Sequence, residues 1–279
     1  MLHVNSEYGK LRKVLMASVS TFHLHPPINT TQAFYYKSDP PKLEKLLAEQ
    51  ECFMGALKAK GAEVILATPR ADCTNQLNTR DVAFVIGNKL IVSPMKEKER
   101  RNEHLALENF ISQFGPNDIV LRPEFGIIEG GDIVLGQSKI YVGISQRTNS
   151  LGLEWLKKNF SDSYEIVPIY LQNNFLHLDV VFNILSSDTA LIFADGIKAD
   201  SLDVIRANFR TIETHADEQI NLPTNVFSID EKTVIADPRN ITTNKRIKAT
   251  GKEVIEIDFS EISKIGGSFR CSTCPIDRD

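Results

Sequence analysis

The amino-acid sequence predicts a mixed α/β protein in which residues 1–279 form one domain of five repeated units around a common axis. Three observations predict this architecture. A hairpin pattern recurs about every 50 residues, helices with one apolar face lie between the hairpins, and a short apolar strand closes each unit. No Pro/Gly-rich linker separates the units, which favours one body over a string of domains.

Four stretches carry the hairpin pattern. Each begins with a polar residue and continues as an apolar run, a short turn and a second apolar run, over residues 81–92, 132–142, 179–193 and 225–236. The runs are rich in β-branched and aromatic residues, and the turns contain Gly, Asn, Asp or Ser, which tolerate tight backbone geometry. We therefore expect a β-hairpin in each stretch.

The segments between the hairpins predict helices and closing strands. Short apolar runs over residues 119–121, 164–167, 211–213 and 254–257 are typical of single strands. Apolar residues also recur at helical spacing, so that one face of each helix can pack on the core. These residues are Leu107, Phe110, Ile111 and Phe114 in the second unit, Leu153, Leu156 and Phe160 in the third, and Leu202, Ile205 and Phe209 in the fourth.

The N-terminal part of the chain fits a first unit that carries an insertion. A strand over residues 11–16, a helix over about 41–60 and a closing strand over 63–66 are predicted, with Leu46, Phe53 and Leu57 on one face of the helix. Residues 22–41 are rich in Pro, Asn, Thr and Tyr. We expect this lid segment to lack regular structure and to cover the centre of the protein.

Composition indicates a small-molecule partner. The formal net charge of -4 at pH 7 and a pI near 5.9 argue against nucleic acid or an acidic membrane, since both bind basic surfaces. The N-terminus lacks a basic segment followed by an apolar run, and every apolar run is too short to span a membrane, so a soluble cytoplasmic protein is expected. Its four cysteines should be free thiols there.

Polar residues open three of the hairpins in a shared register. The motifs are Asn78-Thr79-Arg80-Asp81, Glu129-Gly130-Gly131-Asp132 and His177-Leu178-Asp179. Taken singly, each residue is more often a turn, a cap or a buried structural group. If the units surround an axis, however, Asp81, Glu129, His177 and Asp179 should converge near the centre. The paired glycines indicate either a close approach to a ligand or a positive φ.

The C-terminal Cys271-Ser272-Thr273-Cys274 motif is compatible with several kinds of site. A structural zinc ion needs four ligands, and a redox pair normally lies near the start of a helix that follows an early strand, so both interpretations are weak here. A metal site at His23 and His25 is weaker still, because both lie in the lid segment beside prolines. We favour a single nucleophilic cysteine, Cys271, with Arg270 favouring its thiolate.

In this order and at these spacings, the three motifs and Arg270-Cys271-Ser272-Thr273-Cys274-Pro275 resemble those of the guanidine-modifying enzymes of the pentein superfamily. That superfamily contains arginine deiminases, dimethylarginine dimethylaminohydrolases, amidinotransferases and arginine dihydrolases. The resemblance covers the whole chain and implies the pentein fold, a five-bladed α/β propeller with pseudo-fivefold repeats of hairpin, helix and strand. It implies no cofactor and no metal, and it is compatible with a homodimer.

By this resemblance, Cys271 would attack the guanidinium carbon, His177 would act as general acid and base, and Cys274 would be a structural neighbour. Asp81 and Glu129 would clamp the guanidinium, with Asp179 supporting the site. The planar fork of donors on a guanidinium suits such carboxylates. The reaction would pass through a covalent S-alkylthiouronium.

The substrate is expected to be L-arginine. Asn78, together with Asn29 in the lid segment, is similar to the arginine dihydrolases of the cyanobacterial type, which convert arginine to ornithine, carbon dioxide and two ammonia molecules. Single deimination to citrulline, hydrolysis of dimethylarginine and amidino transfer are the alternatives, in that order. Further substrate-binding candidates are Arg80, and Arg147, Arg100 and Arg101 for the substrate carboxylate, although exposed arginines beside helices are equally compatible with the last three.

Overall fold

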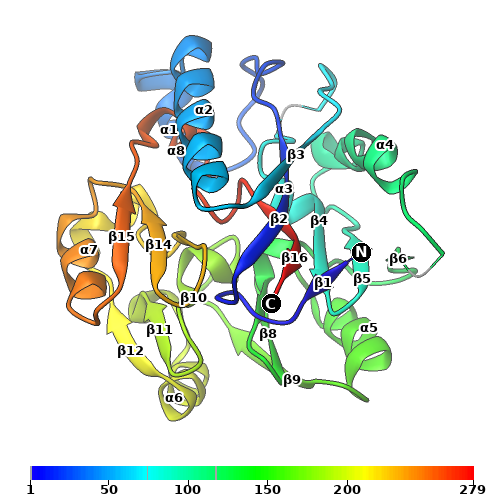
Figure 1. The fold of residues 1–279 in the computed structure, drawn as a ribbon, viewed down its shortest axis with the longest axis vertical. Coiled ribbons are helices and arrows are strands. Elements are labelled where there is room, and N and C mark those ends of the chain that lie inside the picture. The colour runs from blue at the N-terminus through cyan, green and yellow to red at the C-terminus, as the bar shows by residue number, and fades with distance from the viewer. Residues whose placement is uncertain (1, 74, 117) are drawn as a thin grey trace.

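The computed structural model describes residues 2–73, 75–116 and 118–279. Its strands form five separate sheets, four with three strands and one with four. Figure 1 shows these sheets around the middle of the molecule, with the longer helices at its periphery. The predicted repeat of a hairpin and a closing strand is therefore confirmed.

The three-stranded sheets share one pattern. The first two strands form an antiparallel hairpin, and the third strand runs parallel to the second. The four sheets contain β4 (Ala83–Ile86), β5 (Lys89–Val92) and β6 (Ile119–Leu121); β7 (Ile133–Leu135), β8 (Lys139–Ile144) and β9 (Glu165–Tyr170); β10 (Phe182–Ile184), β11 (Thr189–Ile192) and β12 (Arg210–Glu213); and β13 (Phe227–Ser228), β14 (Thr233–Ala236) and β15 (Glu253–Glu256).

Helices connect many of these strands. None in the described part of the chain has the length and apolar content that a membrane crossing requires. The α-helices are α1 (Thr30–Ser38), α2 (Leu43–Ala59), α3 (Thr79–Val82), α4 (Glu108–Ile111), α5 (Ser150–Phe160), α6 (Ala199–Asn208), α7 (Ile241–Lys248) and α8 (Ser260–Ser263), and the 3-10 helices are η1 (Lys98–Arg100), η2 (Glu103–Leu107), η3 (Gly130–Asp132), η4 (Leu178–Val180), η5 (Ala194–Gly196) and η6 (Ala216–Asn221).

The predicted apolar face of α2 is buried in the core. Leu46, Phe53 and Leu57 are fully buried. The ring of Phe53 packs edge-on against Phe259 and Phe269, with centroids 5.4 and 5.1 Å apart. Edge-to-face pairs of this kind add to the free energy gained from burial. The face predicted for α5, which contains Leu153, Leu156 and Phe160, is buried in the same way.

The helix predicted in the second unit is much shorter than its apolar pattern suggested. η2 is followed by the four-residue α4, so Phe114 lies outside the helix. Gly115 and Pro116 follow directly, and this pair cannot continue a helix. The face of α6 is only partly buried as well, since Ile205 is buried whereas Leu202 and Phe209 are not fully covered.

Both ends of the chain complete the remaining sheet, in the strand order β1-β16-β2-β3. β16 (Cys274–Arg278) lies between β1 (His3–Val4) and β2 (Leu11–Ala17), and β3 (Glu63–Ala67) closes the unit. The sequence did not predict β16, because its proline, its acid and its irregular register with β2 hide a strand pattern. The C-terminus is therefore part of the fold.

The lid segment is not wholly irregular, contrary to the prediction. Residues 30–38 form α1, and the side chain of Asn29 caps this helix by accepting a hydrogen bond from the Gln32 N–H at 2.8 Å. Gln32 is fully buried and donates to Asn75 Oδ1 at 2.6 Å and to the Ile265 carbonyl at 2.9 Å. These contacts tie the lid segment to two loops of the body.

Arg278→Ala should lower the free energy of unfolding by about 3 kcal/mol or more, because three carbonyls, two of them buried, would lose their donor. Arg278 is fully buried and donates to the carbonyls of Glu7, Gly9 and Ser228 at 2.7, 2.8 and 2.7 Å. Urea unfolding measures the change.

Arg12→Ala is the matched control. Arg12 also lies in the first sheet, but it is exposed and pairs with Asp279. It should leave the urea midpoint nearly unchanged, since exposed ion pairs contribute little. Equal midpoints for the two variants would contradict the structural role of Arg278.

Candidate active site

Three short turns carry the candidate residues to one place. Asp81 lies in α3, Glu129 directly precedes η3, and His177 directly precedes η4, which contains Asp179. Each turn leads into the first strand of its hairpin. Their side chains are buried, His177 being the most exposed of the four at 5%. The predicted convergence of these four residues is what the structure shows.

The paired glycines let the turns approach one another. A Cβ at Gly130 would lie 2.1 Å from the Arg80 carbonyl oxygen, and one at Gly131 would lie 2.7 Å from His177 Cγ and 2.8 Å from Asp81 Oδ1. Neither glycine has a positive φ. Close approach is thus the reason for both glycines, although the neighbouring groups belong to the protein, and the positive-φ alternative is wrong.

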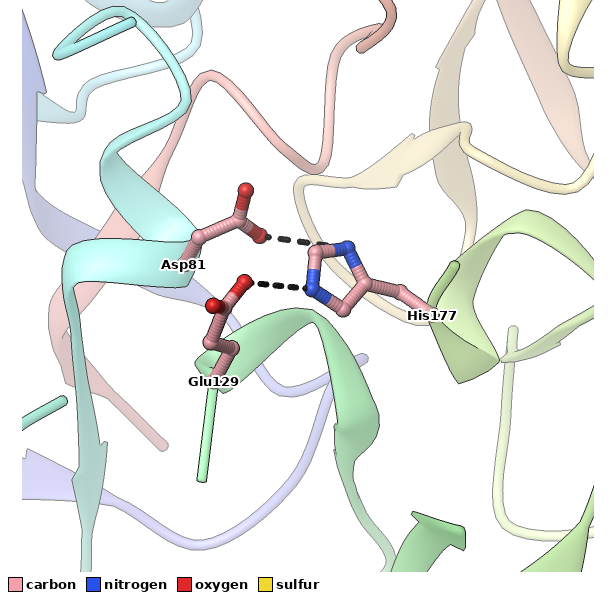
Figure 2. Close-up of side chains that lie close together, drawn as sticks. All are labelled: Asp81, Glu129 and His177. Atoms are coloured by element: carbon pink, nitrogen blue, oxygen red, sulfur yellow. Dashed lines mark hydrogen bonds and ion pairs between the residues drawn. The ribbon is translucent and has the colours of Figure 1, made fainter. Parts of the chain in front are cut away.

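His177 lies between two carboxylates (Figure 2). Its Nε2 is 2.9 Å from Glu129 Oε2, and its Nδ1 is 3.6 Å from Asp81 Oδ1, which is too long for a hydrogen bond. Burial alone would lower the pKa of His177, but the nearby carboxylates outweigh burial and raise it to about 9. The imidazole is therefore protonated at neutral pH and can donate a proton.

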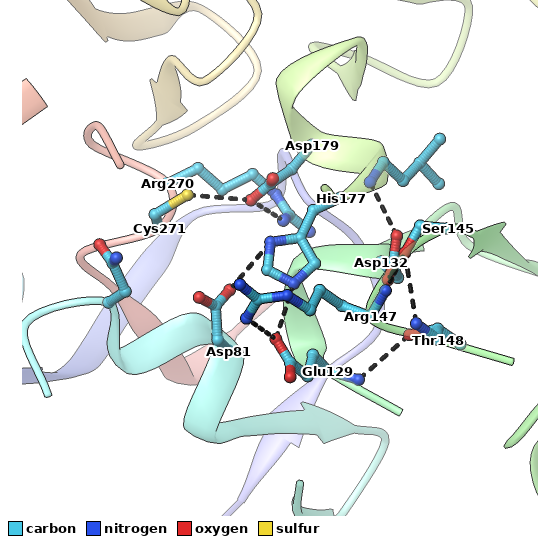
Figure 3. Close-up of polar contacts among 12 residues, drawn as sticks. Asp81, Glu129, Asp132, Ser145, Arg147, Thr148, His177, Asp179, Arg270 and Cys271 are labelled. Atoms are coloured by element: carbon cyan, nitrogen blue, oxygen red, sulfur yellow. Dashed lines mark hydrogen bonds and ion pairs between the residues drawn. The ribbon is translucent and has the colours of Figure 1, made fainter. Parts of the chain in front are cut away.

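Cys271 lies beside a third carboxylate (Figure 3). Its Sγ is 3.4 Å from Asp179 Oδ2 and 3.1 Å from Asn225 Nδ2. Burial, followed by the charges of Asp179 and Asp81, raises the pKa of the Cys271 thiol well above its ordinary value. The free protein therefore holds a thiol that donates to Asp179.

The prediction that Arg270 favours the thiolate is confirmed in direction, but other groups outweigh this effect in the free protein. The Arg270 guanidinium lies 2.9 Å from Asp179 Oδ2 and 2.9 Å from Glu7 Oε1. Its charge is thereby neutralised by two buried acids, and it lowers the pKa of Cys271 less than burial and the acids raise it. Arg270 therefore orders the site, and its charge alone does not convert the Cys271 thiol to a thiolate.

Three buried oxygen atoms around Cys271 lack a donor. Asn78 Oδ1, Asp81 Oδ1 and Asp179 Oδ1 accept no hydrogen bond from any residue that the structure describes. Buried acceptors are nearly always paired, so three unpaired acceptors beside one thiol mark a place where a ligand could bind. A ligand bound there would have to supply N–H or O–H donors, and two of the three acceptors belong to carboxylates. A planar organic cation fits this set.

Asn78 approaches the nucleophile through Gly267. A Cβ at Gly267 would lie 2.2 Å from Asn78 Oδ1 and 3.0 Å from Cys271 Cβ, so the amide and the sulfur flank the same glycine. Asn29 lies against the preceding glycine, since a Cβ at Gly266 would be 2.6 Å from its Nδ2. The Asn29 oxygen accepts from the helix N-terminus and its nitrogen donates to the Ile265 carbonyl at 3.5 Å, so one N–H of this side chain remains for a ligand.

The arginine predictions need correction. Arg100 is buried and donates to Asp81 Oδ2 at 2.7 Å and to Glu103 Oε2 at 2.9 Å, so it is part of the wall and not a receptor for a substrate carboxylate. Arg101 is exposed and lines a separate surface cavity with His104. Neither position supports the predicted contact.

Arg147 and Arg80 differ in whether their positions allow contact with a substrate. Arg147 lies between the site and the lid segment, with Nη1 3.5 Å from Glu129 Oε2 and Nη2 donating to the Ile28 carbonyl at 3.2 Å, which suits contact with a substrate. Arg80 is buried and faces Glu7, 3.7 Å away. Because Arg80 belongs to the ion-pair cluster of Glu7 and Arg270, we correct its predicted substrate contact to a structural role.

Sequence reasoning gave no role to Asp132, Ser145 or Thr148. Asp132 Oδ1 accepts from the Leu178 N–H at 2.8 Å, which fixes the backbone beside His177. Its Oδ2 accepts from Ser145 Oγ at 2.6 Å, and Thr148 Oγ1 accepts from the Glu129 N–H at 3.1 Å (Figure 3). Burial raises the pKa of Asp132 to about 7. The only sequence feature that pointed to Asp132 was its place in the Glu129-Gly130-Gly131-Asp132 motif.

Asp81, Glu129 and His177 could also hold a metal ion by distance alone, because one ligand atom from each lies within 4.8 Å of the others. A metal ion at His177 would have to displace the proton that the neighbouring carboxylates favour on the imidazole. Arg100 already occupies one oxygen of Asp81. The donor set fits an organic cation better than a bare ion.

The fold and the Cys, His and carboxylate cluster define a guanidine-modifying enzyme of the pentein superfamily. Within it, the chain belongs to the family described as N,N dimethylarginine dimethylhydrolase, eukaryotic, whose model matches residues 20–278.

Individual relatives agree with this assignment. The uncharacterized protein YkgA of Bacillus subtilis is 38% identical over 98% of this chain and 94% of its own length. The arginine deiminase of Rhodococcus erythropolis is 27% identical over 74% of this chain, which spans 60% of that enzyme's length. The N-terminal domain of ArgZ, a cyanobacterial arginine dihydrolase solved with product, shares the fold with a TM-score of 0.86 and 20% identity, covering 96% of this chain and 98% of that domain.

Titration of the His177 imidazole by NMR should give a midpoint near pH 9. Glu129→Gln should lower this midpoint, because it removes the negative partner at 2.9 Å. Since the folded protein binds this proton more tightly than the unfolded chain, the proton stabilises the fold below pH 6.5, and the stabilisation is lost as the pH rises through about 9.

Glu97→Gln is the matched control, since Glu97 contacts Arg147 at 3.5 Å and no contact with His177 is found among the described residues. It should leave the His177 midpoint in place. A wild-type midpoint near 6.5, or no change in Glu129→Gln, would refute the assignment.

Proposed function

We propose that the protein is a cysteine-dependent hydrolase of a guanidino group and that its substrate is L-arginine. The observation that carries this proposal is the set of three unpaired buried acceptors, Asn78 Oδ1, Asp81 Oδ1 and Asp179 Oδ1, beside a buried thiol. A guanidinium offers five N–H donors in one plane and one positive charge. Its planar fork can fill these acceptors and bring its central carbon to Cys271.

The positive charge of the substrate favours deprotonation of the Cys271 thiol. In the free protein, burial and the charges of Asp179 and Asp81 keep Cys271 protonated. A guanidinium bound to these two carboxylates offsets their charges, so the thiolate becomes accessible only when a cation occupies the site. A neutral ligand would leave Cys271 as a thiol, which is unreactive, so the cysteine is protected from side reactions.

The chemistry then follows the protonation states. The Cys271 thiolate attacks the guanidinium carbon, and protonated His177 gives its proton to the departing ammonia, which leaves an S-alkylthiouronium. Neutral His177 next takes a proton from water, and the hydroxide adds to the same carbon. The C–S bond then breaks with return of the electrons to sulfur, and the hydroxyl proton of the adduct passes to the departing sulfur, which restores the Cys271 thiol. The product of this first round is citrulline.

Asn78 supports a second round that yields ornithine. The ureido group of citrulline is neutral, so carboxylates bind it less well than they bind a guanidinium. An amide offers both an acceptor and a donor to a urea, and Asn78 Oδ1 is buried and vacant beside Gly267. A repeat of attack, ammonia loss and hydrolysis would release ornithine, carbon dioxide and a second ammonia.

Hydrolysis of N-methylated arginine is the second candidate. The family model that covers residues 20–278 is that of a dimethylarginine hydrolase. The same carboxylates, His177 and Cys271 would serve, with dimethylamine in place of the first ammonia as the leaving group. Hydrolysis of arginine and hydrolysis of N-methylated arginine would use the same site residues and differ in their products.

We also infer that the five sheets are the blades of a propeller and that residues 1–279 form one domain. The support is that both chain ends build the first sheet. One cooperative urea transition is expected, and the Arg278 experiment above would show two transitions if the first sheet unfolded separately.

Purified protein given arginine, N-methylated arginines and agmatine should turn over arginine and release ornithine with two ammonia molecules per arginine, without any added amine. Asn78→Ala should slow the second round by about tenfold or more and make citrulline accumulate, because a buried hydrogen-bond partner is lost. Product analysis by mass spectrometry measures both effects.

Cysteine variants are the controls. Cys271→Ser should abolish turnover, whereas Cys274→Ser should keep most of it, since Cys274 is equally buried but its thiol hydrogen-bonds only the Pro275 carbonyl, at 3.9 Å, among the described residues. Stoichiometric citrulline without ornithine would exclude the dihydrolase. Release of dimethylamine with arginine untouched would establish the second candidate, and an active Cys271→Ser would exclude both.

The lid segment is proposed to open for substrate, because the three site carboxylates and the His177 imidazole are buried while Arg147 donates to the Ile28 carbonyl. Adding arginine to Cys271→Ser should therefore slow hydrogen exchange in α1 several-fold, whereas α5 should be unaffected. Gln32→Ala should accelerate exchange in α1, since it removes the buried tether at 2.6 and 2.9 Å. If neither arginine nor Gln32→Ala changed the rate of hydrogen exchange in α1, the proposed opening of the lid segment would be wrong.

A further inference from the structure

Asn225 holds the nucleophile from two sides. Its side chain is fully buried, its Oδ1 accepts from the Cys271 N–H at 3.1 Å, and its Nδ2 donates to Cys271 Sγ at 3.1 Å. The Asn225 carbonyl also accepts from the Arg270 N–H at 3.2 Å. One residue of the fifth unit thus fixes both the backbone and the sulfur of Cys271.

The orientation of this amide follows from its partners. The backbone N–H of Cys271 can only donate, so the atom facing it must be the amide oxygen. The Asp179 carbonyl can only accept, and it lies 3.3 Å from the other amide atom, which must be the nitrogen. An N–H of Asn225 therefore points at the sulfur whichever protonation state the sulfur has.

The sulfur otherwise has few stabilising neighbours. Asp179 and Asp81 oppose a negative charge on it, and the Arg270 guanidinium is already paired with two acids. The Ser268 backbone is the other hydrogen-bond partner that favours the thiolate. A neutral donor stabilises the thiolate without pairing with the site carboxylates that bind the substrate and without repelling the substrate cation.

We propose that Asn225 is a further catalytic residue, whose carboxamide N–H donates to the Cys271 thiolate and holds the sulfur in line for attack. The proposal rests on the proposed function of Cys271 as nucleophile. When the substrate cation neutralises Asp81 and Asp179, the thiol proton leaves to solvent and the Asn225 N–H strengthens its bond to the charged sulfur. The same bond stabilises the sulfur again when it departs from the thiouronium.

The test is the rate at which iodoacetamide alkylates Cys271 in the free protein, followed by peptide mass spectrometry at a series of alkaline pH values. This reagent is neutral, so the rate reports the thiolate fraction without substrate binding. Asn225→Ala should slow alkylation of Cys271 about tenfold to 100-fold at a fixed pH below the thiol midpoint, and should move that midpoint upward. The value of kcat/KM should fall by a similar factor.

Asn225→Asp guards against misfolding, because it keeps an acceptor for the Cys271 N–H and nearly the same shape. It replaces the donor by a negative charge, so its Cys271 midpoint should lie above that of Asn225→Ala. Asn183→Ala is the matched control. Asn183 is equally buried and donates to the Thr224 and Val226 carbonyls at 3.1 and 2.9 Å, on either side of Asn225, and no contact with Cys271 is found in the described part of the chain.

Asn183→Ala should lose stability while its Cys271 midpoint stays at the wild-type value. The proposal is overturned if both Asn225 variants keep the wild-type midpoint, because the amide would then have no effect on the sulfur. It is also overturned if Asn183→Ala moves the midpoint as far as Asn225→Ala does, because a purely structural effect would explain that result. These outcomes are independent of the proposed function, which fails instead if Cys271→Ser remains active.

Discussion

The ion pairs of Arg270 hold the whole arrangement together. Its guanidinium is buried and reaches Glu7 near the N-terminus, Asp179 in the fourth unit and the Ile133 carbonyl in the third. A charge placed in the interior is tolerated only when its partners are close and well aligned. The chain must therefore bring three distant segments to residue 270, and this requirement sets Cys271 against Asp179. The burial of Glu7 shows the same dependence, since Arg270 and Arg80 overcome the effect of burial and lower its pKa to about 2.

The same principle explains how the site is kept ready for a cation. Asp81 and Asp179 each give their Oδ2 to a protein arginine, Arg100 in one case and Arg270 in the other. Their Oδ1 atoms remain buried without a donor among the described residues. Each carboxylate is thus held rigidly by one oxygen and offers the other, so the ligand does not have to displace the arginines. Preorganised charge of this kind favours a bound cation without rearrangement of the protein.

Local patterns predicted most of the fold, because each hairpin reports itself through alternating runs and turn residues. The strand β6 was predicted over its observed bounds, Ile119–Leu121. Features that depend on distant partners were not visible. The helix α1 is stabilised by the Asn29 cap and by buried Gln32. Polar residues of these types are also common in irregular Pro-rich segments, so they did not predict a helix here. Arg100 gave a similar difficulty, since only the fold shows that its charge is used by Asp81 and Glu103.

The repeat itself accounts for the composition of the site. Asp81, Asp132, Asp179 and Asn225 each lie one to three residues before the first strand of their hairpin, so successive units bring four short polar side chains to neighbouring turns. Three of them are acids with different tasks: Asp81 and Asp179 face the ligand side, while Asp132 holds the Leu178 backbone. The fourth lies 3.1 Å from the sulfur. A carboxylate at that position would place another negative charge against a group that must become negative itself, whereas an amide of the same shape gives it a donor. The repeat thus provides the geometry, and the one neutral member provides the chemical asymmetry that a nucleophile requires.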